Sequence, residues 1–396
     1  MACILRSSRV TISGRGLLHP GGKTHPPVRL ISTKLVKVED SSKPPPWPYE
    51  TKKYRWYHSI LNIDNTFWRF DENTKVIFIE GNIGAGKTTL AQNLADQLGM
   101  KYFPEASLEK DVYPYLFSYN LKDYNDRLQG TAKHFDVEDF YKDPKNWKVA
   151  EFQFMKYIAR CNQYNVALLH LFSTGQGVIL ERSCFSDFVF VDAMTKMGYM
   201  SRPARRHYYD VKTNTIMDYM RPHCVIYLDA PVDVCYDRVM KRNIPYEVNS
   251  PAMNKEYLKE IERGYKNHYL KQMEPYVEMI VYDWTKPADA DIVAEDLEKI
   301  DFDKDRVYFD PKFRDWRNQT LHSEWDELRI KYTNWDTEDR WNHFLPPDRH
   351  GAVELYVTPD DNFEWEQLEK EIEAKQSKYY RRPDDWWGRF KQIFAF

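Results

Sequence analysis

Eight residues, Gly81 to Thr88, have the types and the spacing of a loop that binds phosphate groups. They read GNIGAGKT and match the pattern G-x-x-x-x-G-K-[ST]. Glycines let backbone N–H groups converge on phosphate oxygens, and a helix that follows the loop adds positive potential at its N-terminus. We therefore predict a site in which Lys87 reaches the β- and γ-phosphates of a nucleotide and Thr88 binds Mg²⁺. The alternative is a structural glycine-rich turn, which would need neither Lys87 nor Thr88.

The residues on either side of this loop predict the elements that it needs. Residues 75–80 read KVIFIE, a β-branched and aromatic run that is typical of a buried parallel strand. Residues 89–99 predict an amphipathic helix, with leucines at four-residue spacing and Gly99 as the signal that ends it. A strand before the loop and a helix after it are the context that separates a phosphate site from a chance match.

Four further apolar runs predict the rest of a sheet. They cover residues 100–103, 178–180, 225–228 and 279–282, and helical stretches at 150–172, 201–219 and 255–271 lie between them. This alternation indicates an α/β fold of the phosphate-loop NTPase type, with a five-stranded, parallel, doubly wound sheet. Ligands bind beyond the carboxyl ends of the strands in such sheets. Because Glu105 and Glu181-Arg182 also follow predicted strands, we expect them at the same edge as the loop.

These motifs together resemble the deoxynucleoside kinase family. The resemblance rests on the Gly81–Thr88 loop, on Glu105 after the second strand, on the run ERSCFSD from Glu181 to Asp187, and on arginines in a later lid segment. It covers roughly residues 75 to 300. It implies that Glu105 is the general base for a sugar hydroxyl and that Glu181 and Arg182 lie near the metal and the reacting phosphate. It also implies Thr88 and Glu181 as ligands of Mg²⁺.

The same resemblance implies a nucleoside pocket. Gln153, in the pair Phe152-Gln153, matches the residue that reads the base, and Arg160 follows seven residues later. Asp187 matches an acidic contact to the base, and Glu247 lies where the family places a carboxylate that binds the sugar. The alternative for Gln153 and Arg160 is an ordinary polar helix face, and for Asp187 and Glu247 it is a solvated surface.

The lid segment lacks one cation of the family's pattern. Arg238 and Arg242 match two lid arginines, but Ile244 stands at the third position, and Phe188 replaces the arginine that usually follows Asp187. Phosphoryl transfer depends on cations that neutralise developing charge, so we expect slow transfer but intact phosphate binding. The predicted nucleotide-binding residues are Gly81, Asn82, Gly84, Gly86, Lys87, Thr88, Thr89, Arg238 and Arg242.

The composition of the 396 residues argues against several classes of protein. The 57 basic and 60 acidic residues leave no basic excess that would point to nucleic acid as a partner. No apolar run approaches the ~20 residues of a membrane-spanning helix, so we expect no transmembrane segment. The five cysteines are odd in number and have no C-x-x-C spacing, so we expect no disulfide framework and no zinc, iron–sulfur or haem site.

The two ends of the chain differ from its middle, which is expected to be the kinase-like domain at residues 71–300. The first 38 residues carry seven cations and no acid, which predicts a removable mitochondrial presequence at 1–34, or alternatively a disordered basic tail. Residues 35–70 contain SSKPPPWP, which favours an extended arm that docks through its aromatic residues. Residues 301–396 hold seven of the 12 tryptophans and are predicted to be a docking extension, or alternatively to pack back onto the chain's own domain.

A closer resemblance bears on the function. Residues 173–194, with shorter stretches at 70–77, 102–106 and 223–232, resemble the nucleoside-kinase-like accessory subunits of mitochondrial respiratory complex I. This implies a non-redox subunit on the matrix side of the inner membrane, bound to other subunits of the membrane arm and needed for assembly or stability. It also implies a bound nucleoside or deoxynucleoside tri- or diphosphate, with Mg²⁺. The alternative is an active mitochondrial deoxynucleoside kinase. In a third hypothesis, bound nucleotide only stabilises the fold.

Overall fold

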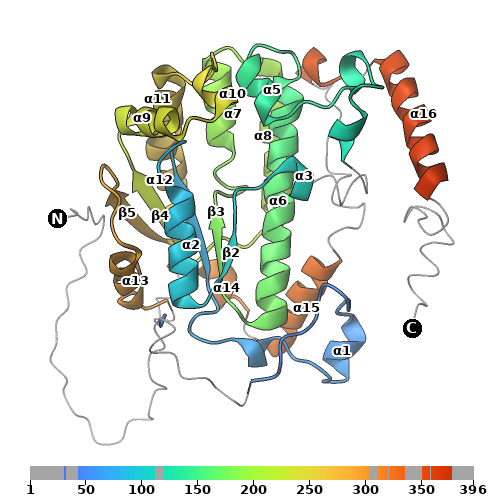
Figure 1. Ribbon diagram of the computed structural model, residues 1–396. Coiled ribbons are helices and arrows are strands. Elements are labelled where there is room, and N and C mark those ends of the chain that lie inside the picture. The colour runs from blue at the N-terminus through green and yellow to red at the C-terminus, as the bar shows by residue number, and fades with distance from the viewer. Residues whose placement is uncertain are drawn as a thin grey trace, which may run out of the picture.

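Five parallel strands form the central sheet, in the order β2-β3-β1-β4-β5 (Figure 1). The strands are β1 Val76–Gly81, β2 Lys101–Phe103, β3 Val178–Glu181, β4 Cys224–Asp229 and β5 Glu278–Asp283. Every residue of β1 is buried, as expected for a central strand that is covered on both faces. β3 pairs with one side of β1 and β4 with the other. The strand order therefore reverses beside β1, and ligands bind at the carboxyl ends of the strands at such a point. The predicted five-stranded parallel α/β fold is confirmed.

The structure is a computed structural model that describes residues 31–32, 43–111, 120–302, 310–319, 321–334, 350–356 and 358–376. Helices surround the sheet (Figure 1): α2 packs against β1, β2 and β3, and the long α6 contacts α3 and α15. The α-helices are α1 Trp56–Ile60, α2 Lys87–Leu98, α3 Leu108–Asp111, α5 Val137–Lys142, α6 Val149–Thr174, α7 Phe188–Lys196, α8 Arg202–Ile216, α9 Val232–Arg242, α10 Pro245–Val248, α11 Lys255–Gly264, α12 Leu270–Met273, α13 Ala290–Glu298, α14 Arg314–Arg317, α15 His322–Thr333 and α16 Pro359–Gln376.

Glycines fix the ends of the two helices that carry most of the site. The predicted stop at Gly99 is present, because this residue has a φ of +67° and its N–H donates to the carbonyl oxygen of Ala95. Gly175 ends α6 with a φ of +75°, and a Cβ atom there would lie 2.0 Å from the carbonyl oxygen of Arg69. Only glycine therefore allows α6 to turn sharply into β3.

Some elements differ from the sequence-based expectation. The helix expected at 255–271 is present as α11 and α12, but a π-helical segment at Tyr265–Tyr269 joins them. The helices α7, α9 and α13 were not among the predicted ones. In α9 only Cys235 and Val239 are buried, so its apolar periodicity is too weak to stand out in the sequence.

The arm and the tail are only partly described. Within the predicted presequence, Ile31 is buried and the backbone N–H of Ser32 donates to Oδ1 of Asn73 at 2.8 Å. Trp316 and Trp325 of the tail pack against Phe172 of α6. Most of the predicted presequence lies outside the described residues, as do the tryptophans at 335, 341, 386 and 387. Among the described residues, no helix has both the length and the apolar character that crossing a membrane requires.

Candidate functional site

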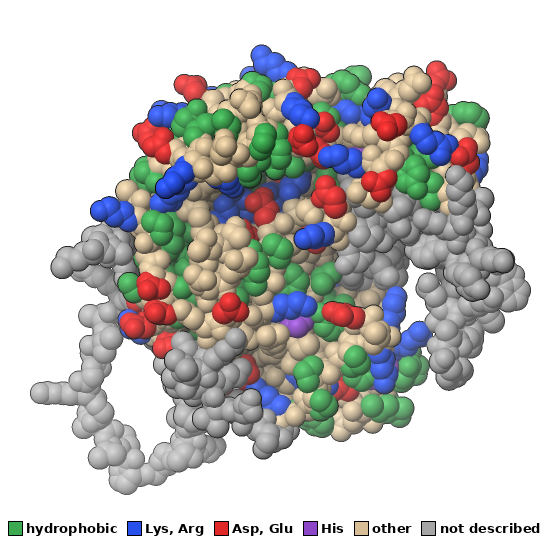
Figure 2. All heavy atoms as spheres, viewed as in Figure 1, with side chains coloured by type: hydrophobic (Ala, Val, Ile, Leu, Met, Phe, Trp, Pro, Cys, Tyr) green, Lys and Arg blue, Asp and Glu red, His purple; other side chains and the backbone are tan. Residues whose placement is uncertain are grey.

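A cavity of about 560 Å³ opens at the carboxyl ends of the strands. In the view of Figure 2 it is a hollow in which basic and acidic side chains gather below the upper helices. Its volume is in the range of small-molecule sites. The predicted site residues that line it are Gly84, Gly86, Lys87, Thr88, Thr89, Glu105, Gln153, Arg160, Glu181, Arg182, Arg238, Arg242 and Glu247.

The glycine-rich loop forms one wall of this cavity and leads from β1 into α2. Gly84 has a φ of +76°, and a Cβ atom there would lie 2.6 Å from the carbonyl oxygen of Cys235, so the loop packs tightly under α9. Lys87 is buried, and its Nζ donates to the carbonyl oxygen of Asn82 at 2.9 Å. Burial lowers the pKa of Lys87 to about 7, and nearby Arg182 adds to this effect. A phosphate group beside this ammonium would favour its charged form.

Thr88 and Glu181 meet at the start of α2 and the end of β3. The Thr88 hydroxyl donates to Oε2 of Glu181 at 3.0 Å, and Tyr102 from β2 donates to the other carboxylate oxygen. A hydroxyl and a carboxylate at this distance suit Mg²⁺, which takes few protein oxygens and completes its shell with water and phosphate. Among the described residues, no group of three or more His, Cys, Asp or Glu side chains is arranged as a metal site.

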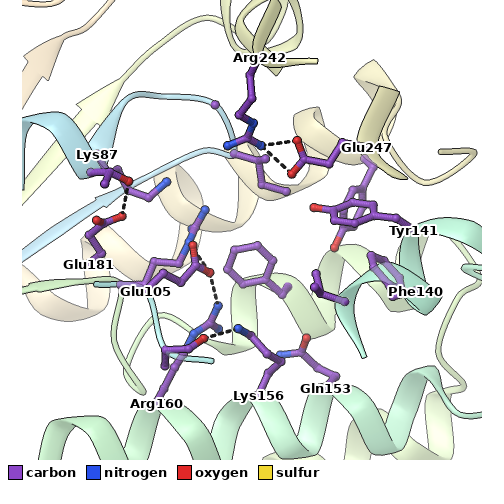
Figure 3. A pocket seen from close by; sticks show the side chains of 18 of the residues that line it. Lys87, Glu105, Phe140, Tyr141, Gln153, Lys156, Arg160, Glu181, Arg242 and Glu247 are labelled. Carbon is purple, nitrogen blue, oxygen red and sulfur yellow. Dashed lines mark hydrogen bonds and ion pairs between the residues drawn. The ribbon is translucent and has the colours of Figure 1, made fainter. Parts of the chain in front are cut away.

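Glu105 faces the cavity between two arginines. Its Oε1 lies 3.2 Å from Nε of Arg182 and 3.3 Å from Nη2 of Arg160 (Figure 3). Burial alone would raise the pKa of Glu105, but Arg182, Lys156 and Arg160 together hold it well below its usual range. The side chain is 40% exposed because it borders the cavity. Glu105 is therefore a charged hydrogen-bond acceptor placed where a ligand hydroxyl would approach.

Arg182 is held in place by more than Glu105. It has a φ of +61°, a backbone conformation that non-glycine residues rarely adopt. Its Nη1 donates to the carbonyl oxygen of Gly81 at 3.0 Å and to the Tyr265 hydroxyl at 2.8 Å. Tyr265 in turn donates to the buried Glu80 at 2.9 Å. The π-helical segment thus brings Tyr265 under the guanidinium, and such segments are frequent at functional sites.

The residues expected to read a nucleoside meet on the opposite wall. Nε2 of Gln153 donates to Oδ2 of Asp187 at 3.0 Å, and Arg160 donates to Oδ1. Tyr208 also donates to Oδ2, at 2.6 Å. Asp187 is fully buried and does not line the cavity, so its contacts fix the orientation of Gln153 and Arg160, which do. The solvated-surface alternative for Asp187 and Glu247 is wrong, since both side chains are buried.

The two lid arginines already have acceptors within the chain. Arg238 donates to the carbonyl oxygens of Ala85, Trp284 and Thr285 at 3.0 to 3.1 Å. Arg242 pairs with Glu247 at 2.6 Å (Figure 3). Ile244, at the third lid position, lies at the start of α10 and brings no charge to the cavity.

Two residues of the predicted phosphate loop support it without lining the cavity. Gly81 ends β1, and Asn82 is buried with its amide donating to the carbonyl oxygen of Leu258 at 2.9 Å. Sequence reasoning missed Lys156, which lies in the cavity wall and donates to the carbonyl oxygen of Ala106 (Figure 3). Its position, three residues after Gln153 and four before Arg160, places it on the same helix face, and this spacing was a usable signal. Aromatic side chains from α5 and α11 complete the wall, namely Phe140, Tyr141 and Tyr257.

Comparison with known proteins agrees with this geometry. Residues 77–313 match the family model described as deoxynucleoside kinase. Over 262 residues the chain is 37% identical to the mouse protein named NADH dehydrogenase [ubiquinone] 1 alpha subcomplex subunit 10, mitochondrial, which covers 64% of this chain and 69% of that protein. The bovine protein of the same name is 37% identical, over 60% of this chain and 67% of its own length.

A more distant relative carries the name of an enzyme. Deoxyguanosine kinase of Dictyostelium discoideum is 26% identical over 67% of this chain and 84% of its own length. The family model spans more than half of the chain and includes the phosphate loop, both walls of the cavity and the lid. The chain therefore belongs to the deoxynucleoside kinase family.

Proposed function

We propose that this chain is a non-redox accessory subunit of mitochondrial respiratory complex I that binds a nucleotide in a kinase-like cavity. The observation that carries the proposal is the 37% identity to the mouse alpha subcomplex subunit 10 over 69% of that protein's length. We place the subunit in the mitochondrion, on the matrix face of the membrane arm, where it contributes to the assembly and stability of the complex. Its partners there are other subunits of complex I.

The ligand of the cavity is a nucleoside or deoxynucleoside tri- or diphosphate, accompanied by Mg²⁺. Support comes from the loop amides and from Lys87, a buried cation whose partner in the structure is a carbonyl oxygen and which a phosphate would suit better. Thr88 and Glu181 would hold the metal ion, which would neutralise phosphate charge. Gln153 and Arg160 would face the base, and Glu247 the sugar. A nucleotide that binds only the native state would stabilise the fold, by an amount that grows with the logarithm of the ligand concentration above Kd.

Little or no turnover accompanies this binding. A general base works best when its pKa lies near the working pH, but Arg182 and its neighbours hold the pKa of Glu105 far below that. Arg238 and Arg242 are engaged with acceptors of the chain itself, and the third lid position carries Ile244. The cavity thus keeps the groups that hold phosphates, but its lid brings fewer free cations to a transferring phosphoryl group than the family pattern has.

Blue-native separation of mitochondria tests the proposal. The chain is expected to migrate with complex I, and depletion of the chain should lower the amount of assembled complex. Migration at monomer mass, away from complex I, would overturn it. If the Lys87→Ala chain assembles normally and retains its nucleotide, the phosphate loop does not have the proposed role in ligand binding.

An active mitochondrial deoxynucleoside kinase is the second candidate. It is supported by the intact set of Lys87, Thr88, Glu105 and Arg182 around one cavity. Its reaction would transfer the γ-phosphoryl group of ATP to the 5′-hydroxyl of a deoxynucleoside. Purified full-length chain with ATP, Mg²⁺ and each of the four deoxynucleosides decides between the two: ATP-dependent formation of a monophosphate favours the enzyme, and nucleotide binding without product rejects it.

A further inference from the structure

In the segment from Tyr54 to Arg69, charged side chains are buried and apolar side chains are exposed, which is the reverse of most protein surfaces. Its charged side chains Asp64 and Arg69 are buried, whereas large apolar side chains point outward. We call the exposed set the apolar ridge; it consists of Trp56, Tyr57, Ile60, Leu61, Ile63, Phe67 and Trp68. Among the described residues, the 13 positions from Trp56 to Trp68 supply seven of the 15 large hydrophobic side chains that are exposed.

Buried ion pairs hold the ridge in this orientation. Asp64 pairs with Arg69 and, at 2.6 Å, with the fully buried Arg329 of α15. The Tyr54 hydroxyl donates to the carbonyl oxygen of Asp64 at 2.7 Å. Because the base of the segment is fixed by charges that must stay paired, the ridge cannot turn its apolar side chains inward.

A second buried carboxylate ties the ridge to the same helix. Asp326 of α15 accepts from the Ser59 hydroxyl at 2.8 Å and from the Thr66 backbone N–H at 2.9 Å. On the surface of the segment, Phe67 stacks on His322 of α15 with ring centroids 4.4 Å apart. The ridge is therefore a rigid feature of the fold, prepared in one shape before any partner arrives, and such preorganisation lowers the entropic cost of binding.

The ridge lies at the end of the molecule opposite to the cavity. It precedes β1 in the chain and packs on α15, beside the end of α6 that leads into β3 (Figure 1). It is thus at the amino ends of the strands, whereas the cavity is at their carboxyl ends. A partner bound to the ridge would leave the mouth of the cavity open to small molecules.

The composition of the ridge fits a protein partner. Contiguous exposed apolar surface marks interaction sites, and Trp, Tyr and Phe are enriched in the buried centres of protein interfaces. A membrane surface is less suited, because the helices of the ridge are short: α1 has five residues and the 3₁₀ helix Phe67–Arg69 has three, and interfacial helices are longer. Lys52, Lys53 and Arg55 directly precede the ridge, and the one exposed acid among residues 50–68 is Glu50. The rim is therefore basic.

We propose that the apolar ridge docks into an apolar depression with an acidic rim on a neighbouring protein subunit. The proposal rests on the proposed function, since that neighbour is a subunit of the assembly named above. The ridge residues near its centre would be desolvated on docking, and Lys52, Lys53 and Arg55 would face the acidic rim. Ile60, at 73% exposure, contributes almost nothing to the chain's own core and is the residue of choice for a test.

Replacement of the endogenous chain by Ile60→Glu or Trp68→Glu in mitochondria tests the proposal by blue-native separation. We expect the fraction that co-migrates with complex I to fall at least about tenfold, because a carboxylate would be buried in an apolar contact. Val353→Glu is the matched control: Val353 is 76% exposed on the short 3₁₀ helix 353–355, next to the start of α8. Ridge variants that co-migrate as well as the unmodified chain would overturn the docking proposal and leave the proposed function intact.

Photo-crosslinking separates the remaining outcomes. A benzophenone side chain at position 60 should form an adduct with one identified polypeptide in stoichiometric yield, and the same group at position 353 should not. If the unmodified chain does not co-migrate with complex I, the proposed function fails, and the adduct at position 60 still decides whether the ridge docks on protein. An absent adduct overturns the ridge proposal. Ridge-dependent flotation of the purified full chain with phosphatidylcholine–cardiolipin vesicles assigns the ridge to lipid and overturns it as well.

Discussion

The two ends of the sheet place charge and apolar surface in opposite ways. At the carboxyl ends, charged side chains such as Lys87, Glu105 and Arg182 border a concave cavity, where a small ligand can reach them. At the amino ends, Asp64 and Arg329 are buried and apolar side chains are exposed on the surface. A cavity lined by charged side chains suits a small anion, whereas exposed apolar surface suits a macromolecule. The comparison teaches that one fold can keep ligand binding and docking apart by placing them at opposite ends of the strands of one sheet.

The largest effect on stability is expected from removing the Asp64 carboxylate, which fixes the ridge at the amino ends of the strands. Asp64→Ala leaves Arg69 and Arg329 buried without their carboxylate, and loss of one partner from a buried pair costs about 3–5 kcal/mol. Denaturant unfolding of the purified chain measures this loss. Glu327→Ala, an exposed acid on α15, is the control and should change the free energy of unfolding by less than about 0.5 kcal/mol. Similar losses in the two variants would contradict the structural role of the buried pair.

The next largest effect is expected on nucleotide affinity, in the cavity at the carboxyl ends of the strands. Lys87→Ala removes a charged hydrogen bond to phosphate, worth about 2–3 kcal/mol, or roughly 30- to 150-fold in affinity for MgATP. Calorimetric titration measures the affinity. The apo protein should be no less stable than the unmodified chain, since a buried ammonium is lost. Lys241→Ala, an exposed lysine of α9, should bind MgATP normally, and equal weakening by both changes would argue against a specific contact.

Acidification should weaken the contact between the arm and α6. Burial lowers the pKa of His170 from 6.5 to about 4, and its Nδ1 lies 3.0 Å from the Tyr49 hydroxyl. Because the unfolded chain binds a proton that the folded chain rejects, stability is complete above pH 6.5 and falls as the pH drops toward 4.

The loss at pH 5 relative to pH 8 from this one histidine is about 2 kcal/mol. Unfolding of the unmodified chain and of His170→Gln across this range isolates the contribution, because the variant should lose about 2 kcal/mol less on acidification. Burial also lowers the pKa of His223, so the variant keeps part of the slope. Identical slopes for the two chains would show that His170 is not the titrating group.

The smallest effect on stability and on nucleotide affinity is expected from a change in the apolar ridge. Ile60→Glu should change the free energy of unfolding by less than about 0.5 kcal/mol, because the side chain is largely in solvent. MgATP affinity should be unchanged, since the cavity lies at the other end of the sheet. A destabilised or ligand-deficient variant would mean that the ridge belongs to the fold itself and that the two ends are coupled.

The sequence predicted the cavity better than the ridge for a physical reason. Glycine spacing and the residues after each strand report directly on backbone geometry, so the positions of Lys87, Glu105 and Arg182 followed from pattern alone. Lys156 was missed although its spacing from Gln153 and Arg160 indicated the shared helix face. Tyr265 was missed because its role depends on a π-helical segment, which no single motif encodes.

The arm shows the limit of composition as a guide. Trp47, Tyr54 and Trp56 look alike in the sequence as candidates for docking, yet the first two are buried in the chain's own fold and the third is 64% exposed. What separates them is the burial of Asp64 against Arg329, a contact over 265 positions of sequence. Contacts at that range decide which side of an arm faces outward, and local patterns carry no information on them.

The contact between Ser32 and Asn73 has a consequence for the predicted removal of residues 1–34. Asn73 accepts from the Ser32 backbone N–H and donates to the carbonyl oxygens of Ser32 and of Leu98 at the end of α2, while Ile31 is inserted into the main core. A cut before Ile31 would leave Ile31 and Ser32 in the folded chain, whereas a cut after Lys34 would remove both residues. Removal of the whole predicted presequence at 1–34 would therefore empty the place of Ile31 in the core and take both Ser32 hydrogen bonds from Asn73.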